Sequence, residues 1–207
     1  YQQQPIRAEG QVFHPEWFRH YDELPDDMMV AMCVDPAFKQ NKTSDYSVVM
    51  TCGMKDGKTW ILEYSHKKQT AGELIDEMVR QIKKWKPFRV GIEAYGAQSV
   101  LGYYFQQKCG ELGINSSYQE IIQKGSKIHK INRLEPKMRE GKIYHRPYMA
   151  EFEAELLAFP TGKHDDIIDC LQMFDELKID TYDVKPEQQE WDGVTMRYNQ
   201  YGEPVYS

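Results

Sequence analysis

The sequence predicts an α/β fold built on a mixed five-stranded sheet with helices on both faces. Two apolar runs of strand length, Met28–Asp35 and Phe88–Glu93, each end in an acidic residue. The dipeptide Asp56-Gly57 separates two further strand-like segments and is a strong signal for a β-hairpin. A helical stripe of apolar residues runs from Glu73 to Lys84. Strands that pair first as hairpins and then alternate with helices are typical of a mixed sheet.

Each element has its own local signal. Pro87 precedes a strand that is short and apolar, which suits the interior of a sheet. Gly141 and Pro160 end two of the helices, and acids begin the last one. The expected strands are Met28–Asp35, Ser47–Met54, Lys58–Lys67, Phe88–Glu93 and Asn115–Ile122, and Lys142–Arg146 also has the character of a short strand. The expected helices are Glu73–Lys84, Ala97–Leu112, Lys127–Arg139, Met149–Phe159 and Asp165–Leu177.

This order of elements matches the ribonuclease-H-like fold, in which the first and fourth strands lie side by side. The folded domain is expected to span residues 24–178. Residues 1–23 lack clean periodicity and are expected to form an extended lead-in, and the start at Tyr1 suggests a fragment of a longer protein. Residues 179–207 carry several acids and little apolar periodicity, which favours a mobile acidic tail, although residues 194–206 also fit a hairpin around Asn199-Gln200.

Composition excludes some classes of protein. No apolar run approaches the roughly 18 residues that a membrane span requires. The four cysteines form no Cys-x-x-Cys pair, so we expect small buried thiols in a reducing compartment, with the cytoplasm as the default. No Gly-rich phosphate loop of the P-loop type is present, and ATP hydrolysis therefore has no place in this chain.

The net charge of −6 conceals a basic block. Between Ile122 and Tyr148, eight Lys and Arg residues face only two Glu residues. Such a block is a candidate surface for contacting phosphates, although a solvated face is the common alternative. The candidate DNA-binding residues are Lys124, Lys127, Lys130, Arg133, Lys137 and Arg139.

The acids at the strand ends carry the functional argument. If the first and fourth strands are neighbours, Asp35 and Glu93 lie together at one edge of the sheet, where open α/β sheets bind their ligands. Asp165, Asp166 and Asp169 begin the last helix at spacings that share one face. Each acid also has an ordinary explanation, as a turn residue or a helix cap. Their combination favours a site for Mg²⁺ or Mn²⁺, which prefer oxygen ligands and support two-metal phosphodiester hydrolysis.

Several segments together resemble one family, the C-terminal nuclease domain of the large terminase subunit of tailed bacteriophages. They are the lead-in containing FHPEWF at 13–18, VDPAFKQNKTSDYSVVM at 34–50, GIEAYG at 91–96, KGSKIHKINRLEPKMREGKIYH at 124–145 and FPTGKHDDIIDCL at 159–171. The resemblance implies an endonuclease that cuts concatemeric double-stranded viral DNA in the cytoplasm of a bacterial host. It also implies that the lead-in follows an ATPase domain of the same polypeptide, and that the portal, the procapsid and the small terminase subunit are partners.

The resemblance assigns roles to individual residues. Asp35 matches the first catalytic acid and Glu93 the second, and both would bind two ions of Mg²⁺ or Mn²⁺ per site. In the third motif, the Asp-x-x-Asp pair of related RuvC-type resolvases favours Asp166 and Asp169 as ligands, with Asp165 as a cap or a neighbour of the ligands. Asp165 and Asp45 are additional candidates to bind metal. Asp45 resembles an auxiliary acid near the metals.

Two alternative functions share this fold. A RuvC-like Holliday-junction resolvase would use the same acids on branched DNA, and the terminase-like lead-in argues against it. A catalytically silent ribonuclease-H-like module would only bind partners, and the complete set of acids argues against that.

Overall fold

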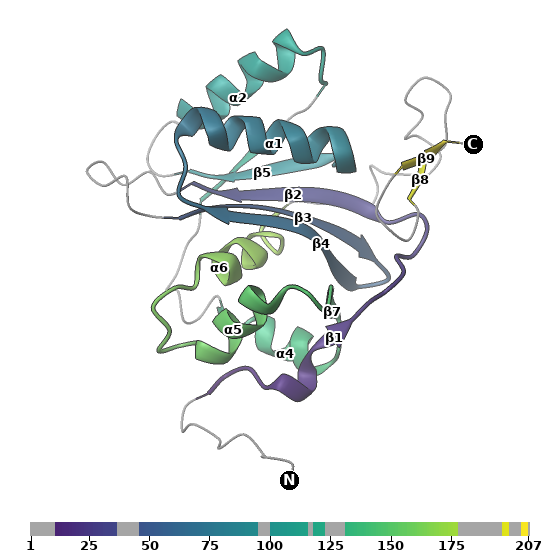
Figure 1. Cartoon of the computed structure of the whole chain (residues 1–207), viewed down its shortest axis with the longest axis vertical. Helices are drawn as coiled ribbons and strands as arrows, with labels where there is room; N and C mark the ends of the chain where they lie inside the picture. The colour runs from purple at the N-terminus through teal and green to yellow at the C-terminus, as the bar shows by residue number, and fades with distance from the viewer. Residues whose placement is uncertain are drawn as a thin grey trace.

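Seven strands form one mixed sheet in the order β1-β7-β4-β3-β2-β5-β6 (Figure 1). The computed structural model describes residues 11–36, 46–94, 100–115, 118–122 and 131–177, together with the backbone of two short strands near the C-terminus. The strands of the large sheet are β1 Arg19–His20, β2 Met29–Asp35, β3 Ser47–Lys55, β4 Lys58–Lys67, β5 Arg89–Glu93, β6 Tyr118–Ile121 and β7 Ile143–His145.

The five central strands form the predicted sheet, in the spatial order β4, β3, β2, β5 and β6. Strands β2, β3 and β4 pair antiparallel, and β5 and β6 continue the sheet in parallel on the other side of β2. Asp56 and Gly57 make the turn between β3 and β4 with positive φ angles of 50° and 71°, as a tight hairpin requires. The predicted adjacency of β2 and β5 is therefore confirmed.

The expected number of five strands was too small, because β7 and β1 extend the sheet beyond β4. Strand β7 lies at the segment that showed weak strand character, and β1 falls inside the expected lead-in. The lead-in is not simply extended: Pro15–Trp17 form a 3₁₀ turn, and the Phe13 side chain is fully buried in the core. A two-residue strand carries no periodicity, so only pairing with β7 reveals it.

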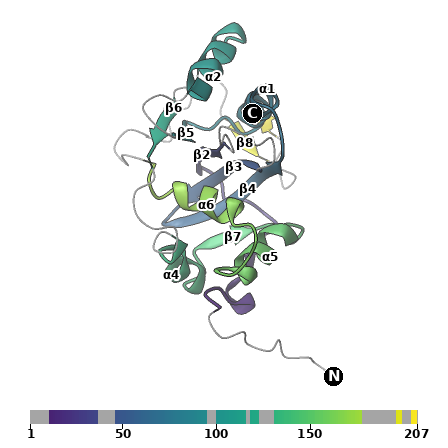
Figure 2. The same ribbon diagram turned by 90° about the vertical axis from the view of Figure 1, so that its left-hand side faces the viewer.

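Helices cover both faces of the sheet. In two perpendicular views, α1 and α2 lie on one face, and α4, α5 and α6 lie on the other (Figures 1 and 2). Helix α1 begins with a capping box, in which Thr70 accepts the Glu73 amide and the Glu73 carboxylate accepts the Thr70 amide. The helices are α1 Ala71–Trp85, α2 Val100–Glu111, α4 Leu134–Arg139, α5 Ala150–Ala158 and α6 Asp166–Met173.

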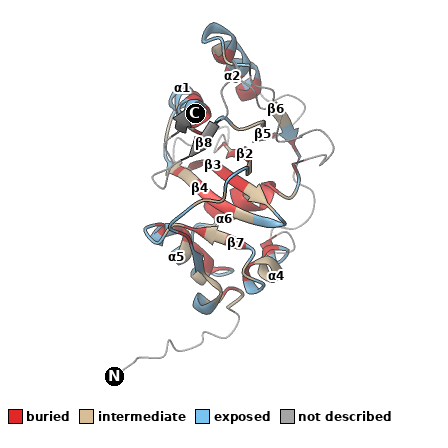
Figure 3. Cartoon of the chain, turned by 90° about the vertical axis from the view of Figure 1, so that its right-hand side faces the viewer, coloured by how far each residue is buried: buried red, intermediate tan, exposed pale blue. Residues whose placement is uncertain are grey.

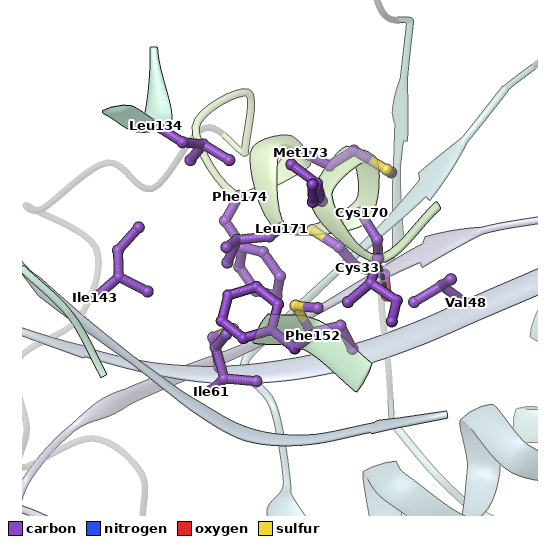
Figure 4. Close-up of a cluster of buried hydrophobic side chains, with 14 of the residues drawn as sticks. Cys33, Val48, Ile61, Leu134, Ile143, Phe152, Cys170, Leu171, Met173 and Phe174 are labelled. Carbon is purple, nitrogen blue, oxygen red and sulfur yellow. Dashed lines mark hydrogen bonds between the residues drawn. The ribbon is translucent and has the colours of Figure 1, made fainter. Parts of the chain in front are cut away.

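Alternation along the strands divides the core into two layers. Met32 and Val34 of β2 pack toward α1 and α2, whereas Ala31 and Cys33 pack toward α6. Buried residues are concentrated in the central strands (Figure 3). Figure 4 shows Cys33 and Val48 of the sheet gathered with Phe152, Cys170 and Leu171 of the helices. By the same alternation, Asp35 faces α6.

The remaining elements differ from the predictions mainly at their ends. Helix α6 ends at Met173, four residues before the predicted end, and α4 covers only the last part of Lys127–Arg139, whose first four residues lie outside the described part of the chain. Strands β8 Met196–Tyr198 and β9 Pro204–Tyr206 pair antiparallel, which agrees with the predicted hairpin, and Asn199-Gln200 lie outside the described residues.

All four cysteines are buried free thiols, as expected. No helix in the described ranges combines the length and the apolar character that crossing a membrane demands.

Candidate active site

Asp35 and Glu93 lie next to each other at one edge of the sheet. Strands β2 and β5 are parallel, with Val34 opposite Ile92, so the two acids follow at the carboxyl end of each strand. Glu93 is only 7% exposed, and its carboxyl group interacts with that of Asp35 through a hydrogen bond. The sequence predicted this arrangement, and parallel pairing produces it because it brings equivalent strand ends to one edge.

Helix α6 brings the third acidic motif to the same place. Asp166 and Asp169 both lie in its first turn, and both act electrostatically on Asp35. The next residue, Cys170, donates its thiol to the carbonyl oxygen of Cys33 at 3.4 Å, which joins α6 to β2 two residues before Asp35. The apolar side of α6 packs on the sheet and thereby directs its acidic first turn toward the strand ends.

The carboxylates repel one another. Burial raises the pKa of Asp35 well above its usual range, and the neighbouring Glu93, Asp169 and Asp166 raise it further. A divalent cation among these groups would offset both the repulsion and the loss of hydration. The donors are all oxygen atoms, which fits Mg²⁺ or Mn²⁺.

Asp165 lies at the N-cap position of α6, but its side chain makes no capping hydrogen bond. Glu155 of α5 supplies the cap from another helix: its Oε1 accepts the backbone N–H of Ile168 at 2.8 Å, in a buried position. Burial raises the pKa of Glu155 to about 7. A tertiary contact therefore fills the capping role, and the other expectation for Asp165, a place at or beside the metal ligands, stays a prediction.

His66 joins the acidic cluster and was not singled out from the sequence. In the sheet, Val48 pairs with Asp35 on one side and with His66 on the other, so all three lie in one row. Nε2 of His66 is 3.4 Å from Oδ2 of Asp166, and its Nδ1 is 2.8 Å from Oε1 of Glu151. Burial lowers the pKa of His66, but the two carboxylates outweigh this and raise it overall. His66 therefore lies within ion-pair distance of Asp166, while its hydrogen bond is made by Nδ1 with Glu151.

Two other residues lie near this part of the site. Nδ1 of His164 is 3.7 Å from Oδ2 of Asp166, and the ring of Tyr46 lies against both His66 and His164. Asp45, the expected auxiliary acid, lies outside the described residues.

The basic block is only partly described. Arg133 pairs with Glu176 at 3.0 Å, Lys137 pairs with Asp175, and Arg139 pairs with Glu135 at 3.1 Å. These three residues are thus partly neutralised on the protein surface. The remaining candidates, Lys124, Lys127 and Lys130, lie outside the described residues.

The sequence matches one family profile, described as the terminase RNaseH-like domain, over residues 32–175. A comparison with curated proteins returns no match.

Solved structures share the fold at low sequence identity. The nuclease domain of the P22 large terminase is 16% identical, with a TM-score of 0.57 over 80% of this chain and 90% of that domain. The large terminase nuclease of the thermophilic phage G20c, with bound magnesium, is 19% identical, with a TM-score of 0.54 over 81% and 97%. The manganese-soaked, inhibitor-bound terminase nuclease domain of human cytomegalovirus is 12% identical, with a TM-score of 0.55 over 85% and 96%.

This chain spans less than half the length of a large terminase structure. The large terminase of another thermophilic bacteriophage is 13% identical, with a TM-score of 0.55 over 79% of this chain. The match covers 43% of that longer protein.

Proposed function

Because this chain belongs to the terminase RNaseH-like domain family, we propose that it is the DNA-cutting domain of a viral packaging enzyme. Its substrate would be concatemeric double-stranded DNA in the cytoplasm of a bacterial host. The observation that carries the proposal is the meeting of Asp35, Glu93, Asp166 and Asp169 at one edge of the sheet. A purely structural role does not explain four acids, one of them with a strongly perturbed pKa, in the place where this fold binds ligands.

The four acids would hold two ions of Mg²⁺ or Mn²⁺. Bound there, the ions would supply an activated water and charge stabilisation at the departing 3′ oxygen. Asp35 would be the central ligand residue, because its carboxyl group interacts with Glu93 and with both Asp166 and Asp169. His66 lies 3.4 Å from Asp166, in the same row of the sheet as Asp35, and Glu155 caps the first turn of α6.

DNA would approach over the basic segment of residues 124–139. Contacts to phosphates read no bases, so binding would be independent of sequence. Because Arg133, Lys137 and Arg139 already pair with acids, the largest share would come from Lys124, Lys127 and Lys130. The ATPase domain of the same polypeptide, the small subunit, the portal and the procapsid would be its partners in packaging.

Cleavage of supercoiled plasmid tests the proposal. We expect nicked and linear DNA with Mn²⁺ or Mg²⁺, none with EDTA, and none with Asp35→Ala or Asp35→Asn. The matched control is Asp56→Asn at the tip of the β3–β4 hairpin, where Asn tolerates the positive φ of 50° equally well. Circular dichroism should show every variant folded. If a folded Asp35→Asn protein cleaves like the wild type, the acids are not the catalytic site.

A branched substrate separates the proposal from the RuvC-like alternative. The terminase nuclease should cut linear and supercoiled duplexes at least as well as a four-way junction. A strong preference for the junction would favour a resolvase.

A further inference from the structure

A second group of potential metal ligands lies at the β1 edge of the sheet. His20 and His145 are register partners on the parallel strands β1 and β7, and Glu153 approaches them from α5. Within the described ranges, the ligand atoms of these three residues all lie within 4.8 Å of one another. Four strand-to-strand steps separate β1 from β2, which corresponds to roughly 19 Å across the sheet. This group is therefore distinct from the acids around Asp35.

One carboxylate oxygen serves both imidazoles. Oε1 of Glu153 is 2.7 Å from Nε2 of His20 and 2.8 Å from Nε2 of His145. The two rings lie nearly perpendicular, at 77°, with their centroids 4.7 Å apart. Three ligand atoms thus converge from three different elements of secondary structure.

His145 is held rigidly. Its side chain is fully buried, and the rings of Phe18 and Phe152 meet it edge-on, with centroids at 5.8 Å and 5.1 Å. Its Nδ1 atom is buried without a hydrogen-bond partner, so the contact with Glu153 leaves the ring incompletely satisfied. Apolar packing therefore aims Nε2 at the cluster, as a preorganised ligand requires.

We propose that His20, His145 and Glu153 bind one Zn²⁺ ion. Imidazole nitrogen suits Zn²⁺ and other late transition metals, whereas Mg²⁺ prefers oxygen, so this site and the acidic site would take different metals. Two His and one Glu are a known zinc ligand set that leaves a fourth position for water. The side chains of His20 and Glu153 are 45% and 26% exposed, which provides that water and a path for the ion.

The distances between the Glu153 oxygen and the two histidine nitrogens need only a small adjustment to fit Zn²⁺. Tetrahedral ligands at the usual Zn²⁺ distances lie about 3.3 Å apart. The two nitrogen–oxygen distances would lengthen from 2.7 and 2.8 Å, which small rotations of the exposed His20 and Glu153 side chains can supply.

Binding would fasten β1 to the rest of the domain. Strand β1 is only two residues long and lies at the edge of the sheet. A ligand that binds only the folded state adds its binding free energy to the stability of that state. The Zn²⁺ ion would therefore stabilise the segment around His20, where the chain enters the domain.

Calorimetric titration of the EDTA-treated 207-residue chain with Zn²⁺ tests the proposal, with excess Mg²⁺ present to occupy the acidic site. We expect one Zn²⁺ per chain. His20→Ala should weaken binding at least roughly tenfold, since even residues behind the ligands cost that much when changed. His20 is the better target because it is exposed, whereas replacing the buried His145 risks unfolding. His14→Ala is the matched control, since His14 lies outside the cluster against Trp17.

Hydrogen exchange gives a second readout. The Tyr21 amide donates to the carbonyl oxygen of His145 at 3.2 Å, so its exchange should slow with Zn²⁺ in the wild type and not in His20→Ala. The double variant Asp35→Asn/Asp169→Asn should bind Zn²⁺ like the wild type. Absence of binding, equal binding by His20→Ala, or loss of binding in the double variant would overturn the proposal, and the last result would place the ion among the acids.

Discussion

A buried polar pair attaches helix α1 to the sheet and allows a quantitative prediction. The Thr51 hydroxyl donates to Oε1 of Gln81 at 2.7 Å, and both side chains are fully buried. Nε2 of Gln81 donates in turn to the carbonyl oxygen of Val49 at 3.3 Å and to Glu77 at 2.9 Å. Water cannot replace a missing partner at this depth, so each deletion should have a measurable cost.

The variant Thr51→Val keeps the shape of the side chain and removes only the donor. Oε1 of Gln81 then remains buried without the hydrogen bond from residue 51, which should lower the free energy of unfolding by about 1–3 kcal/mol. For a chain of this length, the melting temperature should fall by roughly 2–4 °C for each kcal/mol.

Gln81→Leu completes a double-mutant cycle. Alone, it leaves the Thr51 hydroxyl without an acceptor, and it also removes the donor to Val49 and Glu77. Those latter losses occur equally in the double variant, so they cancel in the cycle. The double variant should therefore be less destabilised than the sum of the single variants, by about 1–2 kcal/mol.

Urea unfolding followed by circular dichroism measures these free energies. The reasoning is refuted if the free-energy losses of the two single variants simply add in the double variant. Additivity would mean that neither the unpaired Gln81 oxygen nor the unpaired Thr51 hydroxyl costs stability. DNA cleavage provides a further check. Thr51 faces α1 while the acids face α6, so folded Thr51→Val should cleave plasmid at the wild-type rate.

Three further predictions address charge and the tail. Burial raises the pKa of Glu63, but hydrogen bonds from Trp85, Lys84 and Arg80 outweigh this and lower it below the ordinary 4.5. The ionised Glu63 therefore stabilises the fold at neutral pH, and this stabilisation is lost as the pH falls. Glu63→Gln should lower the unfolding free energy by on the order of 1–3 kcal/mol at pH 7, and its difference from the wild type should shrink below about pH 4.5. A difference that is constant between about pH 7 and about pH 3.5 would contradict this. Charge reversal of Lys127 and Lys130 to Glu should weaken binding to every duplex and flatten its salt dependence, as measured by fluorescence anisotropy; an unchanged slope would place the DNA surface elsewhere. Deletion of residues 184–207 should preserve plasmid cleavage by the isolated domain and impair packaging by the proposed full-length enzyme, because the tail follows all four acids of the proposed site and its negative charge repels DNA. Loss of cleavage would show that the tail is needed for the nuclease fold.

Local patterns in the sequence were sufficient for the central sheet and for the placement of the acids. Apolar runs that end at Asp35 and Glu93 identify two buried strands, and Asp56-Gly57 identifies the hairpin between β3 and β4. These signals lie within a few residues of one another, so no long-range contact is needed to interpret them. The order of the elements then matched the ribonuclease-H-like fold, in which the strands here labelled β2 and β5 are neighbours, and their parallel pairing confirms it.

Only the tertiary structure decided which other groups reach the site. A β-bulge shifts the register between Thr51 and Cys52, so Ile61 pairs with Cys52 but Glu63 pairs with Thr51, and Leu62 is the extra residue. If the register of the hairpin end continued along β4, His66 would pair with Ser47 instead of Val48 and would point to the opposite face of the sheet, because successive side chains alternate. Likewise, Glu155 caps α6 from another helix in place of Asp165, and Glu176 and Asp175 neutralise Arg133 and Lys137. Each of these contacts joins residues far apart in the chain. The sequence determined which groups could interact, but only the tertiary structure determined which of them come into contact.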